Sequence, residues 1–546
     1  GGSVEADVVV VGAGAAGLAA AVAAAGNGLD VIVLDGASQP GGTTVKSSGG
    51  VLVFNNRWHR EQGIQEDRDT TIRLMARTSF PDQYDADAEH LGLDPRDLEM
   101  IETYYDSSSP VFEALESDGV LTLAPQNSLS GDPRGFPSYW TDLEEETLAY
   151  GRTITTRTPD GMEGYGRELI RQLLAGAERQ GAKVVPGQRV TEILHDGDEV
   201  TGVLADDGQT TRTFRARHGV VFGTGGFAQN RELMERHMPG FVPGGGTAAC
   251  AQGDLVSLTS DLDVELAHMD KAWWGEVPVE VVLEQPETPV LLFMPYGESM
   301  FYVDLNGERV VNEKLPYDRR TKIHFVRDED GNDPNRVLIM VYDAAVANEP
   351  TALAPTRWPV PPPHTPAPWA ATSDSLEGLA DEIRARIERI SEFAGGVELA
   401  DDFAAKLQAT AQRFNRYAET GVDEEFGRGS TPIEVDTSGP RRPGSHPNAT
   451  MYPLSSTGPY FAILVAAGTL DTKGGPRVDP VGRMLRKDGT PVRRLYGAGN
   501  CVASPAGDAY WSGGNTLGLA VTFGYLAGQA VSQEAARTAD RDAVTA

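Results

Sequence analysis

Three glycines near the N-terminus, Gly12, Gly14 and Gly17, have the spacing of a loop that binds the pyrophosphate of a dinucleotide. The first glycine allows a tight turn, the second lets the backbone approach the phosphates, and the third lets a helix pack closely on a strand. The amides and dipole of a helix that begins in this loop would face the phosphates. Asp35 lies eighteen residues beyond Gly17 and is placed to accept hydrogen bonds from ribose hydroxyls.

The elements that must position this loop can be read around it. Residues 6–11 form an apolar run typical of a strand buried on both faces, residues 15–25 an Ala-rich helix, and residues 29–35 a second strand. The pattern of a strand that runs into glycine recurs at residues 219–226 and 494–500. The three segments in which a strand runs into glycine lie far apart in the chain. They predict one Rossmann-like α/β nucleotide-binding domain that is interrupted by an insertion.

The predicted domain bounds follow from the positions of these three segments. We expect the nucleotide-binding domain to comprise residues 1–277 and, as a return segment, residues 460–546. Residues 278–459 would form an α+β domain for substrate and catalysis. A chain of 546 residues is too long for a single hydrophobic core, so two domains are also the natural expectation from length.

The insertion itself contains several recognisable patterns. Residues 290–294 look like a strand, Asn306 and Gly307 suggest the turn of a β-hairpin, and residues 374–393 and 402–418 form two amphipathic helix patterns. The proline-dense stretch from Pro350 to Pro368 is interpreted as a stiff surface loop rather than as a ligand for a partner domain.

The second glycine-rich segment, residues 41–50, indicates which dinucleotide binds. It follows directly on the second strand, and its amides and hydroxyls are suited to a long cofactor that reaches beyond the first phosphate. Near the C-terminus the chain returns to the nucleotide-binding domain at residues 497–500, where the backbone can again approach the cofactor closely. A domain that binds only NAD does not require such a segment. FAD is therefore the preferred cofactor.

The residues predicted to bind FAD are Gly12, Gly14, Ala15, Ala16, Gly17, Asp35, Gly36, Gly41, Gly42, Thr43, Thr44, Ser48, Gly49, Gly50, Val190, Gly223, Thr224, Gly225, Gly226, Gly499, Asn500, Asn515, Thr516 and Leu517.

Charge and composition exclude several classes of partner. A formal net charge of −32 repels phosphate backbones and anionic lipid, which argues against nucleic acid and polybasic membrane docking. No run of about 18 apolar residues is present, so no integral membrane segment is expected. Residues 6–35 already read as a folded unit, so no signal peptide is expected there.

Cysteine and histidine usage points to a metal-free protein of the cytoplasm. Cys250 and Cys501 are the two cysteines and form no CxxC pattern, which excludes a disulfide framework and cysteine-ligated zinc or iron–sulfur centres. His268, His324 and His364 form no ligand-spaced pair, so no metal is expected.

With these segments placed, the chain resembles the fumarate reductase/succinate dehydrogenase flavoprotein superfamily over nearly its whole length. Residues 307–313 resemble the G-x-R-F-x-N-E turn of the family's inserted domain. Residues 474–475, 495–500 and 516–518 resemble its C-terminal flavin return. Within the superfamily the chain looks most like the 3-ketosteroid dehydrogenases, which desaturate steroid ring A.

Comparison of single positions favours this subfamily. Tyr317 stands where fumarate reductases carry an arginine acid and where ketosteroid dehydrogenases carry their catalytic tyrosine. Ser512 and Thr516 stand where fumarate reductases have a histidine and an arginine that bind the dicarboxylate. A dicarboxylate needs such cationic groups. These cationic groups are missing here, so a dicarboxylate substrate is not expected.

The resemblance also implies roles for four residues. Tyr510 and the amide of Gly514 match the groups that polarise the substrate ketone, and Tyr317 matches the base that removes the α proton. Tyr139, in a P-x-Y turn, would stabilise the phenolate of Tyr317 by a hydrogen bond. The hydride from the β carbon would pass to flavin N5, facing the N-terminus of a helix that begins near residues 515–516.

Two departures from the family pattern bear on specificity and cofactor attachment. Δ1 enzymes usually read Y-x-G-P-G-G after the return tyrosine, whereas Ser512 resembles the Δ4-(5α) enzymes. The position of the bond introduced and the steroid nature of the substrate therefore stay open. Thr43 stands where membrane succinate dehydrogenases carry a flavin-linking histidine, so the FAD is expected to be non-covalent.

Three hypotheses result. The first is an FAD-dependent dehydrogenase that introduces a C=C bond α,β to the ketone of a small hydrophobic cyclic substrate, with an electron acceptor that the sequence does not identify. The second is a reductase that acts on an enone or a fumarate-type acceptor, and the third an electron-transfer flavoprotein subunit. Trp273, Trp274, Phe293, Met294 and Phe301 either line a lipophilic pocket or belong to ordinary cores.

Overall fold

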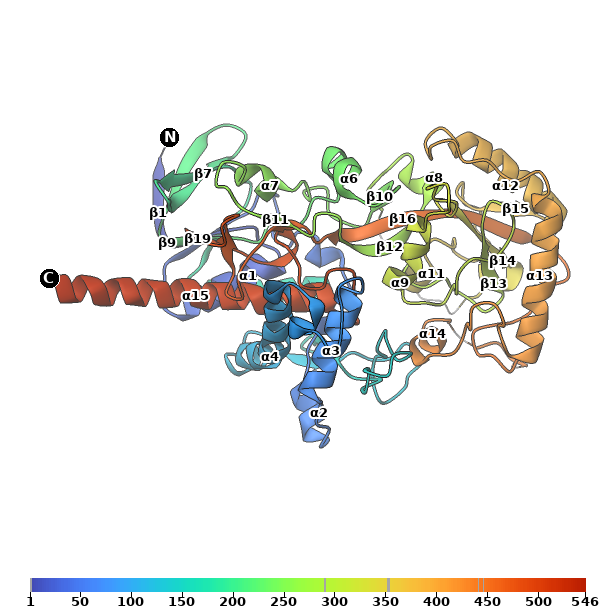
Figure 1. Cartoon of the computed structure of the whole chain (residues 1–546), viewed down its shortest axis with the longest axis horizontal. Helices are drawn as coiled ribbons and strands as arrows, with labels where there is room; N and C mark the ends of the chain where they lie inside the picture. Colours follow the sequence, from blue (N-terminus) through green and yellow to red (C-terminus); the bar gives the residue numbers. More distant parts are fainter. Residues whose placement is uncertain (1, 289–290, 351–353, 440, 445) are drawn as a thin grey trace.

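A mixed eight-stranded sheet at one end of the molecule carries the glycine loop (Figure 1). The structure is a computed structural model that describes residues 2–288, 291–350, 354–439, 441–444 and 446–546. The strand order is β18-β19-β8-β9-β1-β2-β6, and β7 pairs with β8. The strands are β1 (Ser3–Val11), β2 (Val31–Leu34), β6 (Lys183–Val185), β7 (Arg189–Asp196), β8 (Glu199–Asp206), β9 (Thr211–Phe222), β18 (Arg483–Leu485) and β19 (Pro491–Gly497).

The parallel part of this sheet is buried on both faces. In β1, Val8 lies opposite Val31 of β2 and opposite Gly219 of β9, both in parallel register. Strand β19 also pairs with β9 in parallel, which brings the C-terminal return beside the N-terminal unit. Valine and isoleucine fit such a two-sided environment, which explains the apolar runs of these strands.

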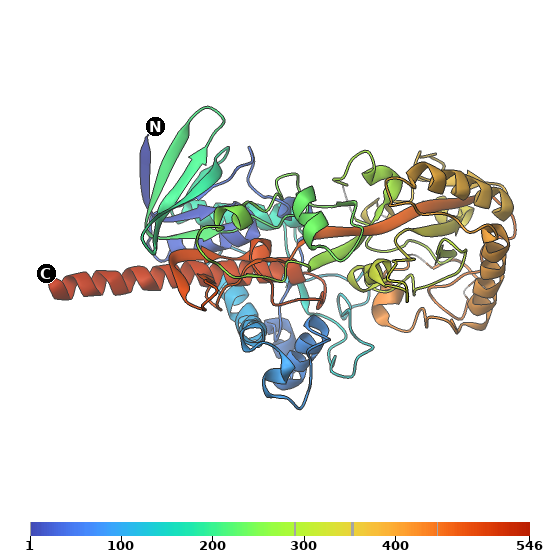
Figure 2. The same ribbon diagram turned by 45° about the horizontal axis from the view of Figure 1, so that its top comes forward.

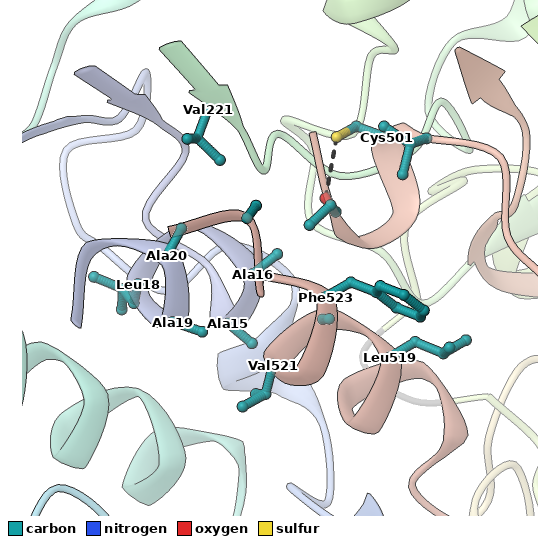
Figure 3. Packing of buried hydrophobic residues seen from close by; sticks show 14 of the residues in the cluster. Ala15, Ala16, Leu18, Ala19, Ala20, Val221, Cys501, Leu519, Val521 and Phe523 are labelled. Carbon is teal, nitrogen blue, oxygen red and sulfur yellow. Dashed lines mark hydrogen bonds between the residues drawn. The ribbon is translucent and has the colours of Figure 1, made fainter. Parts of the chain in front are cut away.

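Two helices made of small residues pack across this sheet. Helix α1 (Ala15–Gly26) lies against α15 (Asn515–Thr545), as the close-up of their contact shows (Figure 3). A Cβ added at Gly524 would lie 2.3 Å from the carbonyl oxygen of Ala16, and one at Gly528 would lie 2.4 Å from that of Ala20. Glycine is therefore required for this approach, and the C-terminal half of α15 then projects away from the body (Figures 1 and 2).

A second lobe is built on the long strand β16 (Tyr460–Thr472), which extends between the two lobes (Figure 1). Its sheet has the order β10-β16-β14-β13, and β12 and β15 also pair with β16. These strands are β10 (Gly244–Gly245), β12 (Ala272–Pro278), β13 (Met300–Val303), β14 (Leu338–Asp343) and β15 (Ala371–Ser373). Helices α12 (Leu376–Ile390) and α13 (Phe403–Thr420) pack on this sheet and share its core.

Shorter elements complete the chain. A three-stranded sheet contains β3 (Val51–Leu52), β4 (Leu123–Pro125) and β5 (Thr153–Thr156), and β11 (Leu266–Ala267) pairs with β17 (Gly475–Pro476). The other α-helices are α2 (Arg57–Glu61), α3 (Arg68–Ser79), α4 (Pro95–Ser117), α5 (Gly166–Arg179), α6 (Arg231–His237), α7 (Asp254–Leu258), α8 (Val279–Val282), α9 (Tyr317–Thr321), α10 (Ala344–Ala347), α11 (Ala354–Arg357) and α14 (Pro432–Asp436). The 3₁₀ helices are η1 (Thr44–Lys46), η2 (Glu89–Gly92), η3 (Lys322–Phe325) and η4 (Gly499–Cys501). No helix of the described residues is long and apolar enough to cross a bilayer.

The helices expected from the sequence are confirmed, whereas two strand predictions are wrong. The patterns at residues 374–393 and 402–418 correspond to α12 and α13. Within the predicted strand 290–294, Val290 lies outside the described residues, and Leu292 forms only an isolated bridge to Glu276. A short apolar run gives the same signal for a strand and for an irregular buried segment.

The predicted hairpin at Asn306 fails for a different reason. Gly307, with φ +88°, does make a turn, and its amide donates to the carbonyl oxygen of Asp304 at 3.0 Å. The segment that follows forms no ladder with β13: one edge of β13 pairs with β14, and the amide of Tyr302 in β13 donates to the Glu313 side chain at 3.0 Å. Arg309 is instead bound in a buried ionic network with Glu313 and Asp423.

One carboxylate joins the two lobes away from the sheets. Asp436, at the end of α14, accepts hydrogen bonds from the Ser128 hydroxyl at 2.7 Å and from the amides of Leu129 and Ser130 at 3.0 Å. A second link is the ion pair between Arg319 of α9 and Asp142, at 2.8 Å. These contacts fix the lobes on either side of the site described below.

Two glycines of the loop, Gly17 and Gly14, are predicted to differ in whether they tolerate alanine. A Cβ at Gly17 would lie 1.8 Å from the carbonyl oxygen of Gly12, so Gly17→Ala is expected to disrupt the packing of α1 on β1 and to lower the melting temperature strongly. At Gly14 the nearest atom would be 3.8 Å away, so Gly14→Ala should fold normally. Thermal unfolding of both variants without added cofactor checks this, and equal melting temperatures would contradict it.

Candidate active site

A cavity lies at the carboxyl ends of the parallel strands. Its lining includes Val11 at the end of β1, Asp35 after β2, Gly223 after β9 and Ala498 after β19. Ligands of doubly wound α/β sheets bind at this edge, because the strands end there and helices begin. The three strand-into-glycine patterns of the sequence thus meet at one cavity.

Most residues predicted to bind the cofactor line this cavity. They are Gly12, Gly14, Ala15, Ala16, Asp35, Gly36, Gly42, Thr43, Thr44, Val190, Gly223, Thr224, Gly225, Gly499, Asn500, Thr516 and Leu517. The predicted residues that do not line it are Gly17, Gly41, Ser48, Gly49, Gly50, Gly226 and Asn515. Gly17 acts instead in helix–strand packing, and the backbone around Gly50 packs against Gly514.

Asp35 has a structural task as well as a place in the cavity. Its carboxylate accepts hydrogen bonds from the amide of Ala13 at 2.7 Å and from that of Ala37 at 2.8 Å. Burial raises the pKa of Asp35, and these two amides act against that rise. The carboxylate therefore holds the glycine loop in shape while it faces the cavity.

Several lining residues were not predicted. They are Val11, Ala13, Ala37, Gln188, Arg189, Cys250, Ala251, Asp254, Leu258, Asp471, Ala498 and Ala520. Some flank predicted positions, so the signal that found their neighbours could have included them. Asp471 had no such signal: it is buried near the C-terminal end of β16, and it accepts from the amide of Gly226 at 2.8 Å. Burial raises its pKa to about 6, against the amides of Gly226 and Thr472.

The cavity fits a dinucleotide with a flavin. Both polar atoms of the fully buried Asn515 amide lack a partner among the described residues, as expected where a cofactor would supply one. Asn515 begins α15, and its neighbours Thr516 and Leu517 line the cavity, so the positive end of a long helix lies at this end of it. A Cβ added at Gly14 would make only ordinary contacts, the nearest with the Thr44 hydroxyl at 3.8 Å, and Gly14 lines the cavity, so its backbone can face a phosphate.

Three tyrosines from distant parts of the chain converge beside this cavity. The Tyr139 hydroxyl donates to the Tyr317 hydroxyl at 3.3 Å. The ring centroids of Tyr317 and Tyr510 are 5.1 Å apart, and those of Tyr139 and Tyr510 are 5.8 Å apart. All three residues were predicted from the sequence to act together, and the structure places them in mutual contact.

Aromatic side chains enclose this cluster. Phe293 packs edge-on against Tyr317 at 4.9 Å between centroids, and Trp273 packs against Tyr510 at 5.0 Å. Two other aromatic candidates lie elsewhere: Trp274 packs on Phe325, and Phe301 lies in the core of the second lobe. The apolar wall of the site is thus smaller than the list of candidates suggested.

Burial governs the protonation of the cluster. It raises the pKa of Tyr317 well above the ordinary value. It also raises the pKa of Tyr510, which the hydrogen bond with Tyr317 partly offsets. A hydroxyl in this setting stays protonated and can donate a hydrogen bond, whereas its phenolate needs donors such as Tyr139.

The conformation of Gly514 is determined by neighbouring backbone atoms rather than by the three tyrosines. Its φ is +84°, and a Cβ there would lie 2.6 Å from backbone atoms of Val51. Gly514 caps the N-terminus of α15, and its carbonyl accepts from the amide of Leu52 at 3.0 Å. The residue therefore brings the helix start, the 50–52 segment and the flavin end of the cavity together.

Buried charges anchor α9, the short helix that begins with Tyr317. Arg320 of α9 donates to Glu276 of β12 at 2.5 Å, and both side chains are fully buried. The amide of Trp274 donates to Asp318 at 3.0 Å, so the same strand holds α9 a second time. Both ring nitrogens of His324 face acceptors, one of them Glu276 at 2.7 Å.

Glu276→Gln should therefore destabilise the protein by roughly 3–5 kcal/mol at pH 7, because it leaves Arg320 as a buried, unpaired charge. Burial would raise the pKa of Glu276, yet Arg320 and His324 outweigh it and lower the pKa to about 2. The stabilisation is present above the ordinary carboxylate pKa and is lost as pH falls towards 2. The difference in unfolding free energy between variant and wild type should shrink over that range.

The control for this prediction is Glu284→Gln, because Glu284 is exposed on the nearby surface. It should change stability by less than about 0.5 kcal/mol. Chemical denaturation at several pH values measures both variants. A Glu276→Gln protein as stable as the control at pH 7 would rule out the anchoring role.

The fold and site together define a flavin-dependent oxidoreductase of mixed α/β architecture. The family model described as "FAD binding domain" matches residues 7–517, and the chain belongs to this family.

Comparison with known proteins adds relatives of full length. The 3-oxosteroid 1-dehydrogenase of Mycobacterium tuberculosis is 27% identical over 601 aligned residues, which cover 98% of this chain and 99% of that protein. The 4-oxocyclohexanecarboxylate 2-dehydrogenase of Sinomonas cyclohexanicum is 27% identical, with 97% and 93% of the two chains covered. The solved structure of 3-ketosteroid Δ1-dehydrogenase from Sterolibacterium denitrificans has a similar fold, with a TM-score of 0.80, 23% identity, and coverage of 97% and 99%.

Proposed function

We propose that this protein is an FAD-dependent dehydrogenase that introduces a C=C bond α,β to the ketone of a hydrophobic cyclic substrate, a 3-ketosteroid. The observation that carries the proposal is the contact of Tyr139, Tyr317 and Tyr510 beside the cofactor cavity. The full-length relatives named for 3-oxosteroid and 4-oxocyclohexane substrates support it, since both names describe dehydrogenation of a cyclic ketone.

The roles of the side chains follow from their positions. Tyr317 removes the proton α to the carbonyl, and Tyr139 donates a hydrogen bond to the phenolate that this step requires. Tyr510, with the amide of Gly514, polarises the ketone and stabilises the developing enolate charge. Phe293 and Trp273 exclude water from the cluster, which strengthens these hydrogen bonds.

The cofactor residues named above would hold FAD across the cavity, with Asp35 near the ribose and the start of α15 near the flavin. FAD, when bound, supplies the acceptor for the hydride from the β carbon. We propose that it is bound non-covalently, because Thr43 cannot form the link that a histidine forms.

We also propose a domain division and a location. Residues 1–277 and 460–546 would form the FAD-binding domain around a substrate domain of residues 278–459, and the strands β10, β12 and β16 would extend from the FAD-binding domain into the sheet of the second lobe. The pairing of β19 with β9 supports the return segment, and β16 extends from one domain to the other. A reducing cytoplasm suits the free thiols of Cys250 and Cys501.

The test is anaerobic bleaching of the flavin absorption band by a panel of ketones. We expect 5α-androstane-3,17-dione to bleach the band, and analysis of its product to distinguish a new Δ1 bond from a Δ4 bond. 4-Androstene-3,17-dione should bleach it as well if the bond formed is Δ1. Bleaching by 4-oxocyclohexanecarboxylate and by no steroid would overturn the steroid assignment and leave the ketone dehydrogenation intact.

A reductase that acts on fumarate fits the site poorly. Ser512 and Thr516 occupy the positions of the cationic groups that a dicarboxylate requires. Arg319, which lies beside Tyr139, is paired with Asp142 at 2.8 Å. Failure of reduced enzyme to be reoxidised by fumarate is the expected result.

A further inference from the structure

The three residues immediately before Tyr510 are held by three lysines from separate elements. Lys473, which follows β16, donates to the carbonyl oxygens of Gly507 at 2.8 Å and Ala509 at 2.5 Å. Lys322 of η3 donates to the carbonyl oxygen of Asp508. Lys271 forms an ion pair with the Asp508 carboxylate at 2.7 Å. We call these residues the lysine clamp.

Lys473 is the buried member of the clamp. Its side chain is 0% exposed, and among the described residues no carboxylate lies within ion-pair distance of its ammonium. The third side of the ammonium faces the ring of Trp273, 4.0 Å from the centroid. Two carbonyls and an aromatic face therefore take the place of a counter-ion.

Trp273 links this ammonium to the reaction site. Its ring lies between Lys473 and Tyr510, 5.0 Å from the Tyr510 ring, and its indole N–H donates to Asn500 of the cofactor cavity at 2.9 Å. On the other side of the segment, Trp140 donates to the carbonyl oxygen of Tyr510 at 2.9 Å. Tyr510 is thus held through its backbone by Trp140 and through its ring by Trp273, and the fully buried ammonium of Lys473 contacts both Trp273 and the segment before Tyr510.

We propose that Lys473 is a positioning residue that aims the Tyr510 hydroxyl at the substrate ketone and strengthens the hydrogen bond that this hydroxyl donates. The inference rests on the proposed function. The carbonyl contacts fix the path of the 507–509 segment, and the positive charge favours the negative charge that develops on the ketone oxygen. Nothing in the local sequence around Lys473 signals this role, because its partners are more than thirty residues away.

The charge of Lys473 is poised to respond to an anion. Burial lowers its pKa to about 7. Asp318 and Asp508 act to raise this pKa, and Lys322 and Lys271 act to lower it. A negative charge at the substrate oxygen would stabilise the ammonium, and by linkage the ammonium stabilises that charge to the same extent.

The experiment compares Lys473→Met with wild type as FAD-loaded protein. Methionine keeps the length of the side chain and removes the charge and the donors. We expect the rate of flavin bleaching at saturating 5α-androstane-3,17-dione to fall by about ten- to a hundredfold. The absorption shift of 1,4-androstadiene-3,17-dione on binding, which reports polarisation of its carbonyl, should become smaller. Amide hydrogen exchange in the peptide that covers residues 504–511 should become faster.

Two further variants separate the possible causes. Lys473→Arg keeps the charge and should restore part of the absorption shift. Lys322→Met, at a partly exposed member of the clamp, should show a smaller effect of the same kind, and it provides the test if Lys473→Met does not fold. A folded Lys473→Met protein with the wild-type rate and absorption shift would overturn the proposal, even if exchange is faster. If wild type neither reacts with nor binds a steroid, the proposed function fails, while hydrogen exchange still reports whether Lys473 fixes the segment.

Discussion

Tyr317→Phe is expected to lower the rate of flavin bleaching by a saturated 3-ketosteroid by about 10²–10⁴-fold, because it removes the hydroxyl that acts as the base. Phenylalanine preserves the ring contacts with Phe293 and Tyr510. The FAD content and melting temperature should therefore stay close to those of wild type. Stopped-flow absorbance under anaerobic conditions measures the rate.

The dependence of the bleaching rate on pH provides a second test of the role of Tyr317. Burial raises the pKa of Tyr317 above its ordinary value, so the population of the reactive phenolate increases as pH rises. The wild-type rate should increase with pH, and the residual rate of Tyr317→Phe should lack this increase.

The matched control is Tyr342→Phe. Tyr342 is fully buried in the second lobe, and its hydroxyl has no hydrogen-bond partner among the described residues. Removing this hydroxyl should leave the bleaching rate unchanged. If Tyr317→Phe bleaches as fast as this control, Tyr317 is not the base.

Tyr510→Phe is expected to lower the bleaching rate by roughly 10²–10³-fold, because the variant loses a donor aimed at the enolate oxygen. The loss should appear in the rate at saturating steroid more than in the steroid concentration that gives half of this rate. The absorption shift of bound 1,4-androstadiene-3,17-dione should largely disappear, since the ketone loses its side-chain donor.

Tyr139→Phe provides the contrast for this prediction. Tyr139 donates to Tyr317 at 3.3 Å, so its loss should displace the pH profile to higher pH, whereas Tyr510→Phe should not displace it. An absorption shift that persists in Tyr510→Phe would assign the ketone to another donor. Gly514→Ala cannot replace this test, because a Cβ there would collide with the backbone of Val51.

Much of the cofactor site could be predicted because local geometry determines it. The glycine spacing at Gly12, Gly14 and Gly17 specifies a turn and a close helix, and the apolar run before it specifies a buried strand. The structure places α1 and β1 where these patterns predict them. The amphipathic helices α12 and α13 follow for the same reason, since their periodicity lies in neighbouring residues.

Local patterns failed where distant contacts decide the conformation. The apolar residues 291–294 look like a strand, yet the neighbouring strands β12 and β14 both pair with β16, and no ladder forms there. The turn at Gly307 is local and was predicted, whereas the choice of β14 as the partner of β13 depends on the order of the whole sheet.

The candidate catalytic residues divide in the same way. The sequence alone determined a dinucleotide loop and, by resemblance, the tyrosines at positions 139, 317 and 510. Only the tertiary structure placed Tyr139 in contact with Tyr317, 178 residues away. It also placed Lys473 in contact with the segment that precedes Tyr510. Backbone turns and burial patterns are set by adjacent residues, whereas a constellation of side chains exists only once the sheets have paired and the two lobes have packed together.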